Sequence, residues 1–285
     1  MKLEFCKMQG AGNDFVVIDN RIAHLTPEQM PLLARKVCAR RTSVGADGLM
    51  VADEPQHGGD AKMWFFNSDG SVGEMCGNGA RCFGRFVYEH FAAKDEIIIE
   101  ATSGDVPAWR QTDRLYKVLL NRPTVLRTGW PTQGADGGPL RAAYVELGDP
   151  GLPHLVVPVP GLAEMEDYGE RLFETGRELR FHPLLPKGAN VNFCQVLGPR
   201  EVLIRTYERG VEDFTLACGT GSGSTVAALQ AMGLVAKGAP VTVHNPGDDL
   251  IIDCRWAGDS VEELFLTGPT NLVATGYILD EDLQL

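Results

Sequence analysis

Two cysteines of this sequence have the same unusual neighbours. Cys76 precedes Gly-Asn-Gly in MCGNGARCFGRF, residues 75–86, and Cys218 precedes Gly-Thr-Gly in ACGTGSGSTVAA, residues 217–228. In both stretches the residues behind the glycines are typical of a helix. Each cysteine is therefore expected at the amino end of a helix of its own.

A helix amino end favours the ionised form of a cysteine. The first backbone N–H groups of a helix have no partners inside it and carry partial positive charge, which stabilises a thiolate and lowers the pKa of the thiol. The glycines that follow allow backbone amides to approach a bound carboxylate closely. One helix end can thus hold both a thiolate and the carboxylate of a substrate.

Two such helix ends in one chain suit the inversion of a carbon centre. Similar halves related by a pseudo-twofold axis can present equivalent residues to opposite sides of one cleft. One sulfur would remove the proton from the Cα of an amino acid while the other donates a proton from the opposite side. Backbone amides would stabilise the developing charge, so this chemistry demands no cofactor. Each motif alone is a weak signal, because a structural cysteine before a glycine-rich helix would look the same.

Composition and charge limit the function classes. The 285 residues are 44% hydrophobic and 22% charged, as in ordinary globular proteins, and are enough for about two domains. A net charge of -12 argues against binding to nucleic acid or to anionic membranes. No segment approaches the ~20 apolar residues of a membrane-spanning helix, and MKLEFCKMQG lacks the apolar core of a signal peptide. We expect a cytoplasmic protein.

The cysteines do not form a disulfide or zinc pattern. There are seven, an odd number, and they are scattered without Cys-x-x-Cys pairs. We therefore expect reduced thiols, most of them buried as small hydrophobic residues, and no metal site.

Strand-like segments outnumber helical ones. Helices are predicted over 24–41, with Thr26 as N-cap, and over 80–91, 161–174 and 224–236. Short strands joined by hairpin-like connections fill most of the rest, and the Pro/Gly-rich segment 122–140 is the expected crossover. We expect an α/β fold of the α+β kind, with mostly antiparallel or mixed sheets in two similar halves. The predicted lobes are 1–121 with 268–285, which carries Cys76, and 122–267, which carries Cys218.

Six blocks of the sequence resemble the signature blocks of the diaminopimelate epimerase family. They are MQGAGNDFVVIDN (8–20), VGADGL (44–49), FNSDGSVGEMCGNGARC (66–82), GLPHLVV (151–157), ANVNF (189–193) and YERGVEDFTLACGTG (207–221). The blocks occur in the family's order and span nearly the whole chain, so the set is highly specific.

The resemblance implies an activity and a fold. Members of the family interconvert LL- and meso-2,6-diaminopimelate, for lysine and peptidoglycan precursor biosynthesis, without pyridoxal phosphate (PLP) or metal. The resemblance also implies a homodimer of chains, each with two pseudosymmetric lobes whose sheets wrap around a central helix.

The resemblance also assigns roles to positions of this sequence. Cys76 and Cys218 match the two acid–base thiols, and His154 with Glu208 matches the pair that tunes the pKa of these thiols. The positions that match substrate-binding residues are Asn13, Asn67, Gly77, Asn78, Asn190, Glu208, Arg209, Gly219 and Thr220. Of these, an arginine suits a carboxylate because it can donate two parallel hydrogen bonds.

Three positions depart from the family pattern. Leu152 stands where many members have Asn, Phe214 where Glu is usual, and Gly48 where some members carry Gln. These departures bear on the far end of the substrate and leave both thiols in place. They keep open a related PLP-independent racemase of another amino acid.

Other classes of protein remain as alternatives. The two thiols could serve a redox protein, in which a disulfide is the signal, or the glycine-rich helix ends could belong to a carboxylate-binding module. GAGND at 10–14 does not predict a dinucleotide loop, because Phe15 stands in the place of the third glycine.

Overall fold

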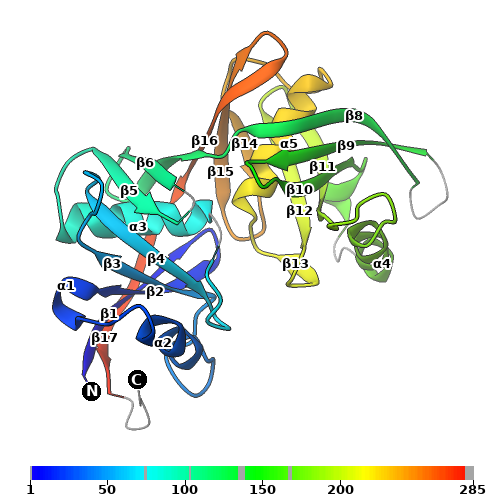
Figure 1. Ribbon diagram of the computed structural model, residues 1–285. Coiled ribbons are helices and arrows are strands. Elements are labelled where there is room, and N and C mark those ends of the chain that lie inside the picture. Colours follow the sequence, from blue (N-terminus) through cyan, green and yellow to red (C-terminus); the bar gives the residue numbers. More distant parts are fainter. Residues whose placement is uncertain (1, 74–75, 103, 134–138, 166–168, 280–285) are drawn as a thin grey trace. The chain divides into compact units, whose positions relative to one another are not determined.

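The chain forms two compact units (Figure 1). The computed structural model describes residues 2–73, 76–102, 104–133, 139–165 and 169–279. Contacts between Cα atoms divide the chain into Met1–Val118 with Gly268–Leu285, called unit 1, and Leu119–Thr267, called unit 2. Each unit is built on a mixed sheet.

In unit 1 the strands follow one another across the sheet from β17 to β7. In that order they are β17 (Asn271–Ile278), β1 (Leu3–Gly10), β2 (Asn13–Asp19), β3 (Gly48–Asp53), β4 (Ala61–Asn67), β5 (Glu96–Ala101), β6 (Gly104–Arg110) and β7 (Leu115–Leu120). The β2–β3 and β4–β5 pairs are parallel and the others antiparallel. The helices are α1 (Asn20–Ala23), α2 (Gln29–Val37) and α3 (Gly77–His90).

Unit 2 repeats this succession. Its strands are β8 (Pro123–Gln133), β9 (Pro139–Leu147), β10 (Leu152–Pro158), β11 (Asn190–Gly198), β12 (Glu201–Glu208), β14 (Val241–His244), β15 (Asp249–Ala257) and β16 (Ser260–Pro269), with β13 (Asp213–Thr215) also on β12. Here the β10–β11 and β12–β14 pairs are parallel. The helices are η1 (Leu162–Glu164), α4 (Gly169–Arg180) and α5 (Gly219–Ala231).

The order of parallel and antiparallel pairs is the same in both units. Each succession has two antiparallel pairs, then a parallel, an antiparallel and a parallel pair, and two antiparallel pairs. Helices α2 and α4 connect the first parallel pair of each unit, and α3 and α5 the second. This repetition confirms the predicted α/β fold of two similar halves.

In each unit a central helix packs against most strands of the sheet. Helix α3 packs against β1, β2, β3, β5 and β6, and α5 against β8, β9, β10, β11 and β15. Between Gly219 and Gln230, only Thr220 of α5 is not buried. Glycines allow this close packing, since a Cβ on Gly223 would lie 3.0 Å from a side-chain carbon of Leu264. A helix buried on all sides is therefore rich in small residues.

Four predicted elements differ from the structure. The helix expected over 224–236 is α5, which begins directly after its cap cysteine, at Gly219, and ends at Ala231. Helix α2 begins at Gln29 with Glu28 as N-cap, because Thr26 instead starts a turn in which its carbonyl accepts the N–H of Gln29 at 3.0 Å. The helix expected over 161–174 is a short 3-10 turn followed by α4, which runs on to Arg180; residues 166–168 lie outside the described residues.

The expected crossover at 122–140 is largely strand. Its residues Pro123–Gln133 form β8, which pairs antiparallel with β9 despite two prolines and a glycine. The register shifts at two places along this pair, between Pro123 and Val125 and between Thr128 and Trp130, so the irregular residues are accommodated by bulges.

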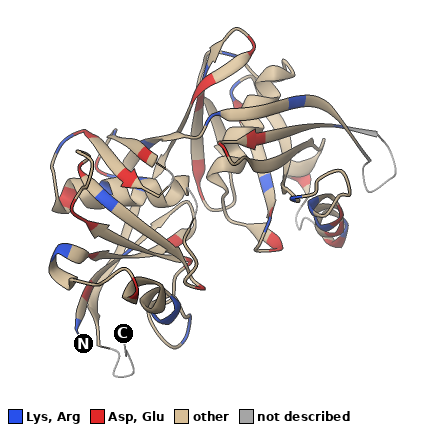
Figure 2. Cartoon of the chain, viewed as in Figure 1, with Lys and Arg blue, Asp and Glu red and all other residues tan. Residues whose placement is uncertain are grey.

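Figure 2 shows basic and acidic residues scattered over the elements of both units. No helix among the described residues is both long and apolar enough to cross a membrane.

Candidate functional site

Cys76 is the N-cap of α3, as the sequence pattern predicted. Its backbone is extended, with φ -115° and ψ 109°, and its Sγ accepts the backbone N–H of Gly79 at 3.4 Å. Its carbonyl accepts the N–H of Ala80 at 2.8 Å and so begins the helical hydrogen bonding. The thiol is partly exposed.

Cys218 caps α5 in the same geometry. Its φ of -118° and ψ of 110° nearly equal those of Cys76, and its Sγ accepts the N–H of Gly221 at 3.2 Å. The hydroxyl of Thr220 lies 3.5 Å from the same sulfur. In both units, therefore, a sulfur occupies the place where Ser or Asp usually satisfies the first helical N–H groups.

The five other cysteines lie in strands, inside α3 or at the end of α2, and all of them are buried. Burial raises the pKa of Cys6 to about 11. It likewise raises the pKa of Cys38, Cys82, Cys194 and Cys254 to about 12. These five side chains are protonated thiols at neutral pH, which agrees with the expected structural role.

In unit 1 two of the predicted site residues meet at the start of α3. Nδ2 of Asn78 donates to Oδ1 of Asn13 at 2.6 Å, and Nδ2 of Asn13 donates to a carboxylate oxygen of Asp47 at 3.2 Å. Because a carboxylate only accepts, Asp47 holds the Asn13 amide with its oxygen towards Asn78. Asp47 thus orients the amide of Asn13.

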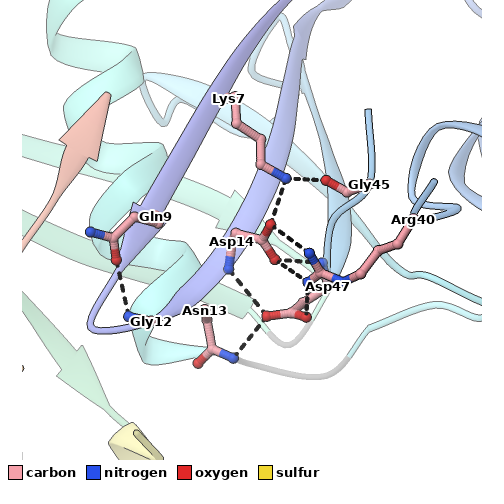
Figure 3. A network of polar contacts seen from close by, with 8 residues as sticks. All are labelled: Lys7, Gln9, Gly12, Asn13, Asp14, Arg40, Gly45 and Asp47. Carbon is pink, nitrogen blue, oxygen red and sulfur yellow. Dashed lines mark hydrogen bonds and ion pairs between the residues drawn. The ribbon is translucent and has the colours of Figure 1, made fainter. Parts of the chain in front are cut away.

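A charged network surrounds this amide (Figure 3). Asp14 bonds to Lys7 at 2.6 Å and to Arg40 at 2.7 Å, and Arg40 also reaches Asp47 at 2.9 Å. Burial alone would raise the pKa of Asp14, but the bonds from Arg40 and Lys7 outweigh it and lower the pKa. The network joins β1 and β2 to the segment before β3.

The GAGND segment forms the turn between β1 and β2. Gly10 and Asn13 are paired, and the two residues between them, Ala11 and Gly12, have φ of 52° and 98°. Positive φ at both central positions is the mark of a tight two-residue hairpin. Asn13 is thereby placed on the first residue of β2.

Asn67 and Gly48 lie side by side at the ends of β4 and β3. The Asn67 side chain donates to the Ser71 hydroxyl at 2.9 Å and so holds its own turn. A Cβ on Gly48 would lie 2.7 Å from the ring of Phe65 and 2.8 Å from the carbonyl oxygen of Phe66. The glycine at this departure from the family pattern is therefore required by local packing.

In unit 2 the predicted residues gather on neighbouring strands. His154 of β10 is in register with Asn190 of β11, and Oδ1 of Asn190 accepts the backbone N–H of Arg209 at 2.8 Å. Glu208, the last residue of β12, accepts a hydrogen bond from the Thr215 hydroxyl at 2.9 Å. Asn190 therefore fixes the backbone at the Glu208–Arg209 turn.

His154 is completely buried. Burial, with the nearby positive charge of Arg209, lowers the pKa of His154 to about 3, so the ring is neutral at physiological pH. Its Nδ1 lies 3.3 Å from Nδ2 of Asn192.

The other two departures from the family pattern are explained differently. Phe214 belongs to an aromatic cluster, with its ring centroid 5.9 Å from that of Tyr207 and 6.2 Å from that of Phe193. Its ring thus stabilises β13 against the sheet. Leu152 is the first residue of β10, and nothing in the structure explains its identity.

Two residues that contact predicted site residues were not predicted from the sequence, although both lie in blocks that resemble the family. Asp47 stands in VGADGL and Asn192 in ANVNF. Their partners come from segments 34 and 38 residues away, so only the strand register brings them together. Among the described residues no three His, Cys, Asp or Glu side chains form a group suited to a metal ion.

Comparison with known sequences gives one consistent family. The family model described as diaminopimelate epimerase matches residues 5–125 and 148–273. A protein of Aquifex aeolicus (strain VF5) named diaminopimelate epimerase is 39% identical over 291 residues, which cover 99% of this chain and 100% of the relative. A protein of the same name from Desulfitobacterium hafniense (strain DSM 10664 / DCB-2) is 37% identical over 300 residues, with 99% and 100% covered.

Comparison with solved structures supports the fold. A Bacillus anthracis phenazine biosynthesis protein of the PhzF family aligns with a TM-score of 0.75 at 15% identity, covering 98% of this chain and 100% of that one. A hydroxyproline epimerase from Agrobacterium vitis aligns with a TM-score of 0.72 at 17% identity, covering 99% and 92%. At these identities the likeness concerns the fold alone.

Proposed function

The chain belongs to the diaminopimelate epimerase family and is an isomerase that interconverts LL- and meso-diaminopimelate, and we propose that Cys76 and Cys218 perform its two proton transfers. The observation that carries this proposal is the matched pair of cap cysteines, each with its sulfur on a backbone N–H. No other cysteine combines a helix start with such a donor in the described part of the chain.

The proposed reaction needs one thiolate and one thiol. The thiolate takes the proton from Cα, and the electron pair of the broken C–H bond is delocalised into the adjacent carboxylate. The thiol then gives its proton to the opposite face of the carbon, so the configuration inverts. After each turnover the protonation states of the two sulfurs are exchanged, and they are restored by reaction in the other direction or by exchange with solvent.

Backbone groups at the helix starts would stabilise the developing negative charge. Gly77, Asn78, Gly219 and Thr220 follow the cap cysteines, where N–H groups lack helical partners. Donors of this kind act most strongly where charge develops in the transition state. We assign these N–H groups to the reacting carboxylate.

The remaining polar residues are assigned to substrate binding. Arg209 suits a carboxylate and Glu208 an ammonium group, because their charges are complementary to those of an amino acid. Asn13, Asn67 and Asn190 would supply amide contacts, and His154 with Glu208 would tune the thiols. The lobes that supply the two thiols are 1–121 with 268–285, and 122–267.

Epimerisation in D₂O tests the proposal. LL-diaminopimelate incubated with the reduced enzyme should yield meso product that carries deuterium at the inverted Cα, and replacement of either cap cysteine by alanine should abolish the inversion. Full inversion by the variant lacking both thiols would disprove the assignment. Turnover of other free amino acids, but not of diaminopimelate, would favour the related racemase.

We further propose that the enzyme works in the cytoplasm as a homodimer without PLP and does not bind nucleic acid or membranes. The net charge of -12 supports the last point. The thiols at the helix ends supply an acid and a base, and the backbone N–H groups would stabilise the negative charge that PLP would otherwise delocalise. Sedimentation analysis tests the dimer, and unchanged activity after treatment with a carbonyl reagent tests the independence from PLP.

A further inference from the structure

Asn192 is a buried amide beneath the first turn of α5. Its side chain is inaccessible to solvent, and its Cα is in register with Val156 of β10 and Thr206 of β12. A Cβ placed on Gly221 would lie 2.3 Å from Oδ1 of Asn192. The amide is therefore next to the residue whose N–H binds the sulfur of Cys218.

The hydrogen bonds of Asn192 fix which end of its amide faces which neighbour. Nδ2 lies 3.3 Å from the carbonyl oxygen of Leu155, which can only accept, and Oδ1 accepts from the Thr206 hydroxyl at 3.0 Å. A flipped amide would place two oxygens against each other at Leu155. The nitrogen of Asn192 is thus directed towards β10.

The same nitrogen determines the tautomer of His154. Nδ2 of Asn192 also lies 3.3 Å from Nδ1 of His154. An amide nitrogen can only donate hydrogen bonds, so Nδ1 of His154 must accept with its lone pair and carries no proton. In a neutral ring the single proton is then on Nε2. Among the described residues this Nε2 has no hydrogen-bond partner, although it is buried. A free N–H donor is thereby held in the interior of unit 2.

We propose that Asn192 is a positioning residue that fixes His154 as a neutral imidazole with its proton on Nε2, so that His154 serves the reaction as a hydrogen-bond donor and not as a proton acceptor. The donor role rests on the proposed function, whereas the tautomer does not. A buried N–H donor stabilises a nearby negative charge, such as a thiolate or a carboxylate, and favours its ionised form.

The tautomer can be measured directly in the resting enzyme. In protein labelled with ¹⁵N-histidine, protonated and unprotonated ring nitrogens have well-separated shifts, and the signals of His154 are those absent from His154→Gln. We expect a protonated Nε2 and an unprotonated Nδ1. A proton on Nδ1, or on both nitrogens, overturns the proposal without any use of activity.

Variants of Asn192 test its part in fixing the tautomer. Asn192→Asp replaces the donor by an acceptor, so the proton of His154 should move to Nδ1 or the ring should become doubly protonated. Thr206→Val is the matched control, because it removes a bond to Oδ1 and leaves the Nδ2 donor in place; His154 should keep its tautomer. An unchanged tautomer in Asn192→Asp overturns the role of Asn192. If Asn192→Asp does not fold, Asn192→Ala gives the same test. Without the Nδ2 donor, His154 should no longer be held in the tautomer with its proton on Nε2 alone.

Kinetics separate a donor from a base. Glutamine can donate a hydrogen bond but cannot accept a proton at neutral pH, so His154→Gln should keep kcat within about 10-fold of the wild type, whereas His154→Leu should lose ~10²-fold or more. Equal losses in both variants overturn the donor role. A wild-type enzyme with the expected tautomer but without epimerisation of diaminopimelate would instead contradict the proposed function.

Discussion

A cysteine at a helix start differs from a cysteine in the core by the groups that its sulfur contacts. The sulfurs of Cys76 and Cys218 accept backbone N–H groups, whereas burial raises the pKa of Cys38 and Cys194 to about 12. Hydrogen bonds to the charged form lower a pKa, and burial in apolar surroundings raises it. The two cysteines to which we assign the proton transfers thus differ from Cys38 and Cys194 in the groups that their sulfurs contact.

This contrast predicts selective alkylation of the thiols. Iodoacetamide at neutral pH should modify Cys76 and Cys218 first, because the thiolate is the reacting species and a pKa of about 11 or 12 leaves the other five almost entirely protonated. Peptide mass spectrometry over a time course gives the order. As a matched control, Cys82→Ala should leave the order and the activity unchanged, since Cys82 lies in α3 but is not its cap. Modification of Cys82 ahead of both cap cysteines would contradict the prediction.

A second prediction concerns a hydroxyl in the middle of α5. Thr225 is completely buried, and its Oγ1 has no hydrogen-bond partner among the described residues. Thr225→Val replaces this hydroxyl by a methyl group of similar volume and removes the penalty of a buried, unsatisfied polar atom, which is about 1–3 kcal/mol. The free energy of unfolding from urea titration should rise by about 1 kcal/mol while kcat stays constant. Destabilisation by this amount would mean that the hydroxyl has a partner that the variant loses.

Among the elements, the segment before β3 holds the start of β2 through Asp47. Asp47→Ala should lower kcat/KM by about 10- to 100-fold, because Asn13 loses the acceptor that orients its amide towards Asn78 and a misplacement of about 1 Å can cost ~10²-fold. Steady-state kinetics with diaminopimelate measure the change. Asp113→Ala, which removes an exposed carboxylate from the turn between β6 and β7, is the control and should leave kcat/KM unaltered. An unchanged value in both variants would show that Asp47 does not orient Asn13.

The connection between β3 and β4 depends on one carboxylate of β5. Glu100 accepts the backbone N–H groups of Gln56, His57 and Gly59 at 2.5, 2.6 and 2.9 Å. Burial opposes its charge, but the bonds from these three N–H groups outweigh burial and lower the pKa of Glu100. A carboxylate whose pKa is lower in the folded state stabilises the fold above its unfolded pKa, and the contribution is lost as pH falls through the folded value.

Glu100→Gln should therefore destabilise the protein most at neutral pH. The difference in unfolding free energy between wild type and variant should be largest at pH 7. It should decrease as the pH falls below about 4.3, the ordinary pKa of a glutamate. Urea titrations at pH 7, 5 and 3.5 measure this difference. A constant difference over this range would mean that the three N–H groups do not lower the pKa.

The elements and the cap cysteines were predictable because their signals are local. The bond from Gly79 to Cys76 and that from Gly221 to Cys218 each span three residues, and the hairpin at Ala11 and Gly12 is contained in one turn. The segment that became β8 was misjudged because its prolines and glycine are tolerated by bulges and by pairing with β9. A pattern of turn residues does not reveal such pairing.

Contacts between distant segments could not be predicted from the sequence. The orientation of the Asn13 amide depends on Asp47, and the tautomer of His154 depends on Asn192, through registers that the sequence does not state. The need for glycine at position 48 likewise comes from the ring of Phe65 on the neighbouring strand. The residue types of the site were therefore apparent before the structure, but not the groups that orient them.

For the whole molecule, duplication explains why two equivalent thiols exist. The units share one order of strand pairs, and in each the helix that connects the second parallel pair begins at a cap cysteine. Duplicated units place the same functional group on two related scaffolds, after which surrounding residues can diverge. Asn192 lies beneath the cap of α5, whereas Met50 and Phe15 approach the corresponding glycine of α3, so the two thiols have unequal surroundings.

The proposed two-thiol mechanism predicts complementary behaviour of the two single cysteine variants. In Cys76→Ala the thiolate of Cys218 remains, and it should still remove and return the Cα proton of a substrate with one configuration. In Cys218→Ala the thiolate of Cys76 remains, and it should do the same for a substrate with the opposite configuration. In D₂O, each variant should therefore exchange the Cα hydrogen of one stereoisomer without inversion, and the two variants should prefer opposite configurations. Mass spectrometry and chiral chromatography of LL- and meso-diaminopimelate after incubation measure both properties.

The double variant should exchange neither isomer, which controls for exchange by other groups. Exchange of the same configuration by both single variants would mean that the two thiols act from one side of the carbon, and the division of the reaction between the units would be wrong.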